Sequence, residues 1–528
     1  MPPSDVALTA SGPLPAGPVP APARRSLVSI EVLAFVVGAS TLGSEIAAAR
    51  LMAPWFGAST IVWANTIATV LVALSIGYFI GGRLADRDPT PGGLARLVLA
   101  AAILLAIVPF IANPFLRISV EALDSVSAGA FVGSLIGVLV LIAAPVMLLG
   151  AVAPYAVRLK VTTVEEAGKV AGRLSAISTL GSLVGVFLAA LLLVPVVGTR
   201  RTFLCFAVAL AVVSALALGR RGAIVIPLLL AGLIAIPVGT VKATGGGKVV
   251  WEKETEYQYA RVVERPDGEL RLELNEGQAV HSVYKPGEYL TGNYWDEMLV
   301  LPFAANPTRA PRSVAILGNA AGTTARAYGH YFPATEIDGV EIDGDINDLG
   351  RELFGLEDRP GLRLHTADAR PFLRRADRRW DTIIVDAYRQ PYIPFYLSTQ
   401  EFFTLVRKRL NPGGQVIVNV GHPEGSDELE KVLTATMAKA FPTVLRDPSQ
   451  RVNTMLVGTA APASSTVLAA ASGPLGGIPA ELRPTALAAA QRLRPGLRGG
   501  RVYTDDVAPV EWLIDASIVE VAAEGEGG

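Results

Sequence analysis

The chain has few reactive or charged residues for its length of 528. It holds one cysteine and four histidines, and charged residues make up 18% of it. The single cysteine, Cys205, cannot form an internal disulfide, and without a CxxC motif or a Cys/His cluster there is no sign of a metal site. The formal net charge of −1 provides no global field to recruit nucleic acid. We therefore predict neither a metal site nor a nucleic-acid partner.

The shortage of charge accompanies an excess of apolar residues. Hydrophobic residues make up 51% of the chain and the mean hydropathy is +0.43, values that a soluble protein of this size rarely reaches. About 20 residues in a helix cross about 30 Å of hydrocarbon. The sequence therefore predicts a multi-pass α-helical domain in the cell membrane over 27–242, after a disordered Pro-, Ala- and Gly-rich tail over 1–26. The seven expected spans are about 28–52, 60–83, 94–112, 129–157, 171–197, 202–219 and 222–241.

The first span resembles the start of a signal peptide because Arg24 and Arg25 directly precede it. It is long, contains Glu45 and Arg50, and is followed by six more spans, so we interpret it as a signal anchor that stays in the protein. Glu45 has two interpretations. An ionisable residue inside a span is a functional candidate, whereas pairing with Arg50 near the interface would make it structural.

Basic residues gather in alternate connections between the spans. The positive-inside rule places these connections and the N-terminus in the cytoplasm. Seven spans would then put the C-terminal half outside, where no nucleoside cofactor is normally supplied. Either one segment does not cross, or the C-terminal half does not perform ordinary cytosolic chemistry, and both alternatives stay open. The basic residues are Arg24, Arg25, Arg83, Arg87, Arg96, Arg158, Lys160, Lys169, Arg173, Arg220 and Arg221.

From about residue 249 the pattern becomes that of a folded soluble domain. Two strands, 256–264 and 269–275, flank a Pro-Asp-Gly turn and predict a small antiparallel sheet within 249–305. Short apolar strands then alternate with helices over 306–460. This alternation predicts an α/β Rossmann-like domain of the methyltransferase type, with ligands at the carboxyl ends of mostly parallel strands. The expected strands are 313–317, 337–342, 362–366, 382–385 and 415–420.

Three consecutive strand ends carry residues suited to a nucleoside. Small residues from Gly318 to Gly322 let the backbone approach a ligand, and the helix that follows offers unpaired N–H groups. Glu341 lies 23 residues past Gly318, a spacing suited to hydrogen bonds with a ribose diol. Asp368 and Ala369 follow the third strand, where a carboxylate can accept from a base amine. Together they predict a nucleoside site, and a set of solvated strand-end acids is the alternative.

Asp386 ends the fourth strand at the same edge of the sheet. A Pro- and aromatic-rich loop that includes Tyr392 follows it, and such a loop beside a strand-end carboxylate is typical of an active-site lid. A general base at Asp386 needs a pKa raised by burial. We predict that Asp386 is catalytic, and the alternative is a residue that only caps the loop.

Together these residues resemble the spermidine synthase (polyamine aminopropyltransferase) family, whose membrane-fused bacterial members carry a similar block of spans. The resemblance covers about 249–460. It implies a transferase in polyamine biosynthesis that moves an aminopropyl group from decarboxylated S-adenosylmethionine to an amine. It also implies that no cofactor is tightly bound and that the nucleoside-sulfonium donor (or S-adenosylmethionine itself) is a co-substrate. The implied partners are the lipid bilayer and a small amine acceptor, and a homodimer is left open.

The resemblance assigns a role to individual residues on the donor side. Gln258 matches the cofactor-contacting glutamine of the family. Glu341 would hold the ribose, and Asp368 with Ala369 would hold the adenine. Ala321 departs from the pattern, because the family has an Asp there that holds the amino group of the donor.

On the acceptor side, the resemblance makes Asp386 the catalytic base. Tyr294 takes the aromatic substrate position, which Trp295 would fill after a one-residue shift, and Tyr392 joins the substrate site. Arg389 stands in the region where the family has a second acceptor-binding Asp. Two like charges about 4 Å apart at an effective dielectric near 20 repel by about 4 kcal/mol, so an arginine facing the site would disfavour a diamine. The acceptor therefore need not be putrescine.

Three functions of different classes remain open. The first is the membrane-bound aminopropyltransferase. The second is an S-adenosylmethionine-dependent methyltransferase or a catalytically silent nucleoside-binding domain. The third is a transporter or membrane sensor with a regulatory soluble domain, in which Glu45 would matter. The remaining segment, 461–528, is expected to be a loosely packed or helical appendage, and we expect residues 503–520 to pack the C-terminus against the sheet.

Overall fold

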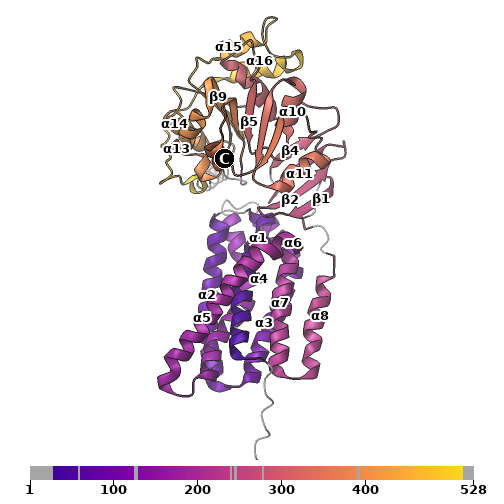
Figure 1. Cartoon of the computed structure of the whole chain (residues 1–528), viewed down its shortest axis with the longest axis vertical. Coiled ribbons are helices and arrows are strands. Elements are labelled where there is room, and N and C mark those ends of the chain that lie inside the picture. Colours follow the sequence, from indigo (N-terminus) through magenta and orange to yellow (C-terminus); the bar gives the residue numbers. More distant parts are fainter. Residues whose placement is uncertain are drawn as a thin grey trace, which may run out of the picture.

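A long helical bundle and a mixed α/β domain make up the molecule (Figure 1). The computed structural model describes residues 28–57, 60–123, 129–237, 241–242, 246–275, 279–388, 393–514 and 516. The predicted tail, Arg389, Tyr392 and the last residues of the chain lie outside these ranges. The two-part arrangement confirms the predicted fold class.

Among the described residues, six helices are long and apolar enough to cross a membrane. The seventh predicted span is a shorter helix of about 21 Å at 1.5 Å per residue, which ends before Pro237 because a residue preceding proline disfavours the helical conformation. The bundle contains α1 (Ile30–Phe56), α2 (Thr60–Arg87), α3 (Pro91–Leu123), α4 (Gly129–Lys160), α5 (Val164–Leu188), η1 (Ala189–Leu193), α6 (Val194–Val197), α7 (Thr199–Leu218), η2 (Arg221–Ile224) and α8 (Val225–Ile234).

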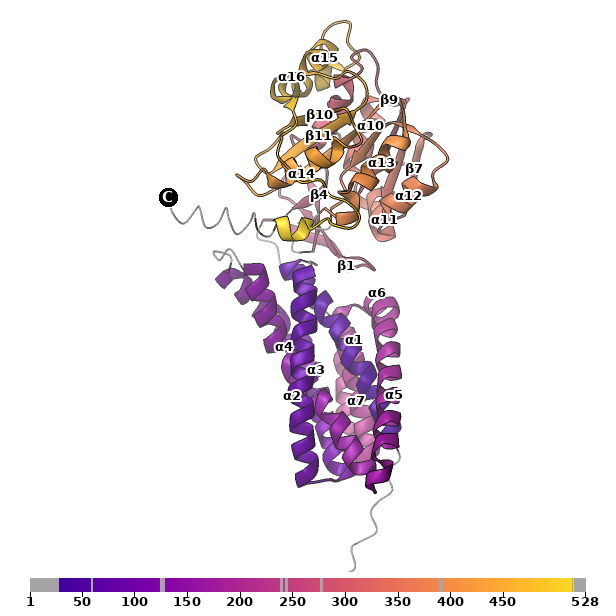
Figure 2. The same cartoon turned by 90° about the vertical axis from the view of Figure 1, so that its left-hand side faces the viewer.

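The two ends of the bundle differ in what they contact. At one end, the start of α1 meets the end of α4, where Lys160 Nζ lies 2.8 Å from Glu31 Oε1. The basic connections α2–α3, α4–α5 and α7–α8 also lie at this end. At the other end, the backbone N–H of Thr199, the first residue of α7, donates to Glu254 of the C-terminal half over 2.7 Å. The α/β domain therefore sits on the end opposite to the basic connections (Figures 1 and 2).

Arg50 does not pair with Glu45, which was one of the two interpretations that the sequence left open. Five residues along a helix separate two side chains by about 140° around its axis, so they face different neighbours. The Arg50 guanidinium instead donates to the backbone carbonyl of Glu256. Within the part of the chain that the structure describes, Glu45 is half-buried and has no hydrogen bond or ion pair.

A four-stranded antiparallel sheet opens the C-terminal half, with its strands in chain order. Leu272 and Leu274 pack against Ala321, Leu349 and Phe354, so this sheet covers one side of the α/β domain. Two of the strands were predicted, and two were missed. The strands are β1 (Lys248–Glu254), β2 (Tyr259–Glu264), β3 (Leu270–Leu274) and β4 (Val280–Tyr284), followed by α9 (Trp295–Val300) and η3 (Leu301–Ala304).

The larger sheet has eight strands in the order β12-β10-β11-β9-β8-β5-β6-β7. Strands β5 to β9 pair in parallel, whereas β10, β11 and β12 extend the sheet in antiparallel pairs that the sequence did not predict. The strands are β5 (Ser313–Leu317), β6 (Glu336–Glu341), β7 (Leu362–Thr366), β8 (Trp380–Val385), β9 (Leu410–Gly421), β10 (Thr443–Asp447), β11 (Asn453–Thr459) and β12 (Arg494–Pro495).

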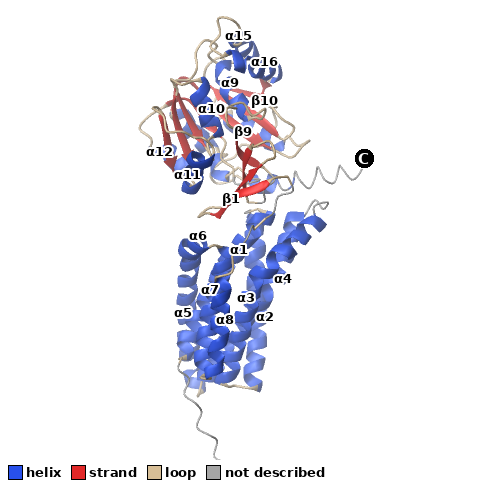
Figure 3. Cartoon of the chain, turned by 90° about the vertical axis from the view of Figure 1, so that its right-hand side faces the viewer, coloured by secondary structure: helices blue, strands red, loops and turns tan. Residues whose placement is uncertain are grey.

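Helices cover this sheet on both faces (Figure 3). After α16 the chain returns, and Tyr503, Val510 and Ile514 are buried in the same apolar cluster as Phe402 and Phe403. The C-terminal segment is thereby packed against the α/β domain. The remaining helices are α10 (Thr323–Tyr331), α11 (Gly344–Leu353), α12 (Ala369–Arg375), η4 (Phe395–Leu397), α13 (Gln400–Lys408), α14 (Glu428–Met437), α15 (Ser465–Ala471), η5 (Ala480–Leu482) and α16 (Arg483–Arg492).

Candidate active site

The carboxyl ends of four neighbouring parallel strands meet at one edge of the large sheet. In spatial order β8, β5, β6 and β7, these strands are followed or ended by Asp386, Gly318, Glu341 and Asp368. Neighbouring strands lie about 4.8 Å apart, so the row from Asp386 to Asp368 extends over about 14 Å. The chain runs from β5 outward to β7 and returns to β8 on the other side of β5, which makes this edge a topological switch point, where α/β sheets bind ligands.

The glycine loop after β5 has the backbone that its sequence suggests. Gly318 and Gly322 have φ angles of 87° and 90°, in the left-handed region that favours glycine. A Cβ on Gly318 would also lie 2.5 Å from the carbonyl oxygen of Asp386, so the loop and Asp386 are in direct backbone contact. Ala321 is fully buried, and its N–H donates to Ser282 Oγ over 3.0 Å. The position that holds an acid in the family therefore faces the small sheet.

Glu341 is buried behind this loop. Its Oε2 accepts from the N–H of Ala320 over 2.9 Å, and its Oε1 accepts from the N–H of Asp343 over 3.2 Å. Burial raises the pKa of Glu341 to about 7, because the loss of water outweighs these hydrogen bonds. A ligand hydroxyl that donates to this carboxylate would favour its charged form.

The turn before β2 brings Gln258 to the same edge. Thr255 Oγ1 donates to Asp343 Oδ2 over 2.6 Å, and Gln258 Nε2 lies 3.5 Å from the same oxygen. Burial raises the pKa of Tyr257, and the nearby charges of Glu256, Asp343 and Asp368 add to the effect. The small sheet therefore places Gln258 and Tyr257 beside the strand-end acids.

Asp368 is more occupied than the sequence suggests. Its Oδ1 accepts from the N–H of Arg370 over 2.9 Å and caps α12, whose first residue is the buried Ala369. Its Oδ2 accepts from the hydroxyl of Tyr396 over 2.9 Å. A base amine would share an oxygen with one of these donors, so Asp368 lies at the expected place but already has a structural role.

Asp386 has the surroundings that a general base requires. Asn419 Nδ2 donates to its Oδ1 over 2.8 Å, and the side chains of Trp295 and Tyr294 also hydrogen-bond to it. Burial raises the pKa of Asp386 to about 7, with these hydrogen bonds opposing the shift. Tyr294 and Trp295 were the two candidates for the aromatic substrate position. Both contact Asp386, so the structure does not require a choice between them.

A second layer of polar residues fixes the orientation of Asn419. Its Oδ1 accepts from Asn453 Nδ2 over 2.9 Å, so its Nδ2 is the group that faces Asp386. The hydroxyl of Tyr388 donates to the backbone carbonyl of Asn419 over 2.9 Å and accepts from the N–H of Gly421. Asn419 was not predicted from the sequence, although a single polar residue inside the apolar run of β9 was an available signal.

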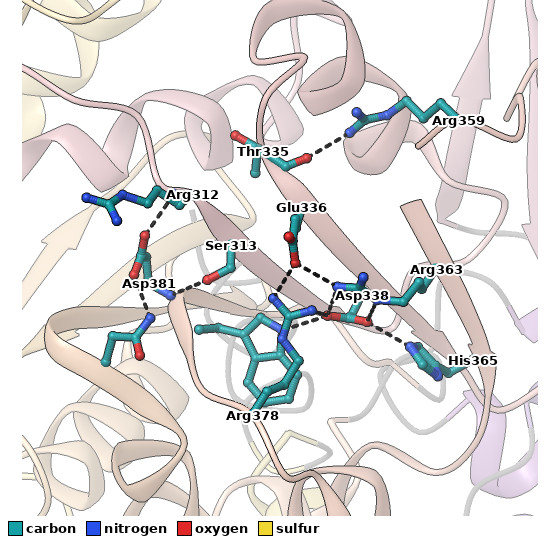
Figure 4. A network of polar contacts seen from close by, with 12 residues as sticks. Arg312, Ser313, Thr335, Glu336, Asp338, Arg359, Arg363, His365, Arg378 and Asp381 are labelled. Carbon is teal, nitrogen blue, oxygen red and sulfur yellow. Dashed lines mark hydrogen bonds and ion pairs between the residues drawn. The ribbon is translucent and has the colours of Figure 1, made fainter. Parts of the chain in front are cut away.

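The opposite edge of the sheet holds a cavity of about 620 Å³ that is separate from this site. Beside it, a network centred on Asp338 links β6 to its neighbours (Figure 4). The carboxylate of Asp338 is 2% exposed and accepts from Trp380 Nε1 over 2.8 Å and Arg363 Nε over 2.9 Å, while His365 Nε2 lies 2.9 Å away. Because each of these groups bonds another protein group, we interpret the network as structural.

Comparison with known proteins gives one family for this half of the chain. Residues 294–456 match the model of the spermine/spermidine synthase domain. The probable polyamine aminopropyl transferase of Bifidobacterium longum is 38% identical over 195 residues, which cover 37% of this chain and 42% of that protein. The polyamine aminopropyltransferase of Pyrobaculum arsenaticum is 30% identical over 216 residues, which cover 37% of this chain and 69% of that protein.

The alignments leave much of the first curated relatives unmatched, since the chain spans 42%, 60% and 64% of their lengths. The crystal structure of a probable spermidine synthase from Corynebacterium glutamicum is 21% identical, with a TM-score of 0.37, and covers 49% of this chain and 98% of that chain. Through its C-terminal half, the chain belongs to the spermidine synthase (polyamine aminopropyltransferase) family.

Proposed function

We propose that the chain is a membrane-bound aminopropyltransferase. It moves an aminopropyl group from decarboxylated S-adenosylmethionine to an amine that need not be putrescine. The observation that most supports this function is the carboxyl group of Asp386, whose pKa is near 7, in backbone contact with a glycine loop that leads to a buried Glu341.

In this proposal the donor lies along the row of strand ends. Glu341 would accept from the ribose hydroxyls, and Asp368 with Ala369 would hold the adenine. The glycine loop from Gly318 to Gly322 would let the backbone approach the ligand, and Gln258 would contact it from the small sheet. These roles come from the family and from the placement of the residues. The domain over 306–460 would thus be the nucleoside-binding unit.

The transfer requires an unprotonated amine. An alkylammonium has a pKa of about 10.4, so moving its proton to a carboxylate of pKa about 7 costs about 4–5 kcal/mol if the amine keeps its solution value. The free amine attacks the carbon next to the sulfonium, the carbon–sulfur bond breaks, and methylthioadenosine leaves. The proton goes to Asp386. Holding nitrogen, carbon and sulfur in line can supply much of the acceleration.

The acceptor side is less defined than the donor side. Tyr294 and Trp295 would flank the amine beside Asp386. Tyr392 and Arg389, which the sequence places in the loop over the site, lie outside the described residues, so the substrate role of Tyr392 and the charge effect of Arg389 remain predictions.

Binding and product analysis with the full chain in detergent tests the proposed function. Calorimetry against methylthioadenosine, decarboxylated S-adenosylmethionine and S-adenosylmethionine should favour the first two. We expect Asp386→Asn to abolish transfer while binding is kept. Methyl transfer from S-adenosylmethionine would support the methyltransferase alternative, and failure of all three nucleosides to bind the folded chain would overturn the proposal.

We also propose that the long helices hold the protein in the cell membrane. The positive-inside rule then puts the α/β domain on the non-cytoplasmic side, since it sits on the end of the bundle away from the basic connections. Protease accessibility of the C-terminal half in oriented vesicles tests this placement. Protection of that half in right-side-out vesicles would contradict it.

A transport role is the second candidate, and one cavity favours it. A space of about 310 Å³ lies between α1, α2, α4 and α5, with hydroxyl groups from Thr41, Ser178 and Ser182 among its lining residues. Glu45 lies one helical turn beyond Thr41 on α1. Flux of a polyamine in proteoliposomes that is lost in Glu45→Gln would support this role, and absence of flux over a broad polyamine panel would count against it.

A further inference from the structure

The edge of the sheet that carries the candidate active site is also the face that meets the helical bundle. Arg50, near the end of α1, bonds the carbonyl of Glu256, which directly precedes Tyr257 and Gln258. On the C-terminal segment, Glu511 Oε2 accepts from the N–H of Thr60, the first residue of α2, over 2.9 Å. Both contacts join the domain to the ends of long apolar helices, so the site faces the end of the helical bundle (Figures 1 and 2), which lies at the membrane surface in the proposed placement.

Exposed apolar side chains gather in the segments at this face. Tyr257, Phe395, Val507 and Trp512 are 38%, 53%, 59% and 72% exposed in the whole chain; we call these four residues the apolar rim. Tyr257 lies by the strand-end acids. Phe395 precedes Tyr396, whose hydroxyl bonds one of those acids, so Phe395 belongs to a segment at the same edge of the sheet.

Contacts with neighbouring residues place the other half of the apolar rim at the same level. Val507 lies two residues after Asp505, which forms a bidentate ion pair with Arg370 at the start of α12. Trp512 directly follows Glu511, which bonds the first residue of α2. The start of a crossing helix marks the membrane–water interface, where tryptophan and tyrosine are enriched.

Among the residues that the structure describes, the acceptor end of the site offers one carboxylate, that of Asp386. The side chains that hydrogen-bond Asp386 are the amide of Asn419 and the aromatic groups of Tyr294 and Trp295, none of which carries negative charge. Asp296, the next acid along α9, already accepts from the N–H groups of Thr291 and Gly292. Within the described residues, this arrangement matches one ammonium group, whereas a diamine brings two.

We propose that the acceptor is an amphiphilic primary amine embedded in the bilayer surface, with its ammonium group at Asp386 and its apolar part in the lipid that the apolar rim contacts. This inference rests on the proposed aminopropyl transfer. The lipid ammonium gives one proton to Asp386, and its nitrogen bonds to the propyl carbon of the donor. The carbon–sulfur bond breaks with its electron pair on sulfur, methylthioadenosine leaves as a neutral thioether, and the lipid nitrogen remains as a secondary ammonium that carries the aminopropyl arm.

The test uses the full chain in nanodiscs of phosphatidylcholine, with or without phosphatidylethanolamine, and decarboxylated S-adenosylmethionine. Release of methylthioadenosine and the mass of the lipid are measured, with putrescine and a short alkyl monoamine as soluble acceptors. We expect phosphatidylethanolamine to raise release at least about tenfold above putrescine, with an aminopropylated lipid as product. Equal release with putrescine and no lipid product would overturn the inference but keep the transferase. No release with any acceptor would overturn the proposed function itself.

Trp512 gives a variant that isolates the lipid contact. Trp512→Ala should raise the KM for the lipid amine at least about fivefold, leave turnover of the soluble monoamine unchanged, and be rescued by Trp512→Phe. The matched control is Leu475→Ala, since Leu475 is 94% exposed in the connection after α15, at the end of the domain away from the bundle. Equal effects of Trp512→Ala on both acceptors, or an equal effect of Leu475→Ala, would contradict a lipid contact at the apolar rim.

Discussion

Replacing Asp386 by asparagine should affect turnover and stability in opposite directions. The wild-type carboxyl group has a pKa near 7 because burial outweighs hydrogen bonds from Asn419, Trp295 and Tyr294. Asparagine keeps the shape of the side chain but cannot take a proton from the amine. We therefore expect transfer to be lost, while the wild-type enzyme should become more active as the pH rises through about 7.

The size of the stability effect follows from the pKa. The folded value of about 7 exceeds the ordinary value of 3.8 by about three units, each of which corresponds to about 1.4 kcal/mol. Because the folded state binds the proton more tightly, the unfolding free energy of the wild type falls by about 4 kcal/mol as the pH rises from about 4 to above 7. Asparagine avoids this cost, but its amide N–H groups would oppose the donors of Trp295 and Tyr294, at about 1–2 kcal/mol. Asp386→Asn should therefore be more stable than wild type by about 2–3 kcal/mol at about pH 8, similar in stability at about pH 5, and less stable at about pH 4.

Two measurements on the full chain in detergent check this calculation. Thermal unfolding at about pH 8 should place the variant several degrees above wild type, with the order reversed at about pH 4. The fluorescence of Trp295, whose side chain bonds Asp386, should titrate near pH 7 in wild type and not in the variant. A titration midpoint near 4, or a variant that melts below wild type at both pH values, would refute the conclusion that burial raises the pKa of Asp386.

Three further substitutions test the geometry around this site. Gly318→Ala should lower the unfolding free energy by more than about 2 kcal/mol and weaken methylthioadenosine binding, because its Cβ would clash with the carbonyl oxygen of Asp386. The control Gly413→Ala, at a φ of 77° with open space around it, should cost only about 1 kcal/mol. Equal unfolding free energies of the two variants would exclude the clash at Gly318. Glu341→Gln should weaken methylthioadenosine binding by about ten- to hundredfold in calorimetry, and unchanged affinity would remove its ribose role. Asp338→Ala should cost about 3–5 kcal/mol in urea unfolding at neutral pH. Burial opposes the shift, but the hydrogen-bonding neighbours of Asp338 lower its pKa in the folded state. The stability difference between wild type and Asp338→Ala should therefore persist above pH 3.8, the pKa of the unfolded state, and shrink as the pH falls through the lower pKa of the folded state. A stability difference that does not change with pH would contradict this reasoning.

Much of the α/β domain could be predicted because its signals are local. The five parallel strands show as short apolar runs with helical segments between them, and β5 and β7 have the predicted bounds. Strands β10 and β12 were missed because most of their residues are half-buried or exposed at the sheet edge. Strand β11 is buried, and it was missed because its antiparallel pairing with β9 joins residues that are distant in the sequence. Strand β1 was missed for a similar reason, since its side chains are mostly exposed or half-buried.

The candidate site was only partly visible in the sequence. Gly318, Glu341 and Asp386 follow strands, and parallel strands align their ends, so their proximity followed from the fold class. Asn419 was not found, because its contact with Asp386 joins two strands at residues that are 33 positions apart. The hydrogen bond from the hydroxyl of Tyr396 to Asp368 was also hidden, because the two residues are 28 positions apart.

The sequence by itself determined the block of long apolar helices, the Rossmann-like alternation that follows it, and which residues end the parallel strands, because run lengths and periodicities are properties of neighbouring residues. Only the tertiary structure decided that the pKa of Asp386 is raised to about 7, since its desolvation comes from residues on other elements. It also decided that the edge with the candidate active site faces the helical bundle. That orientation depends on the contacts of Arg50 with Glu256 and of Thr60 with Glu511, between residues 206 and 451 positions apart, and no local pattern records pairings at such separations.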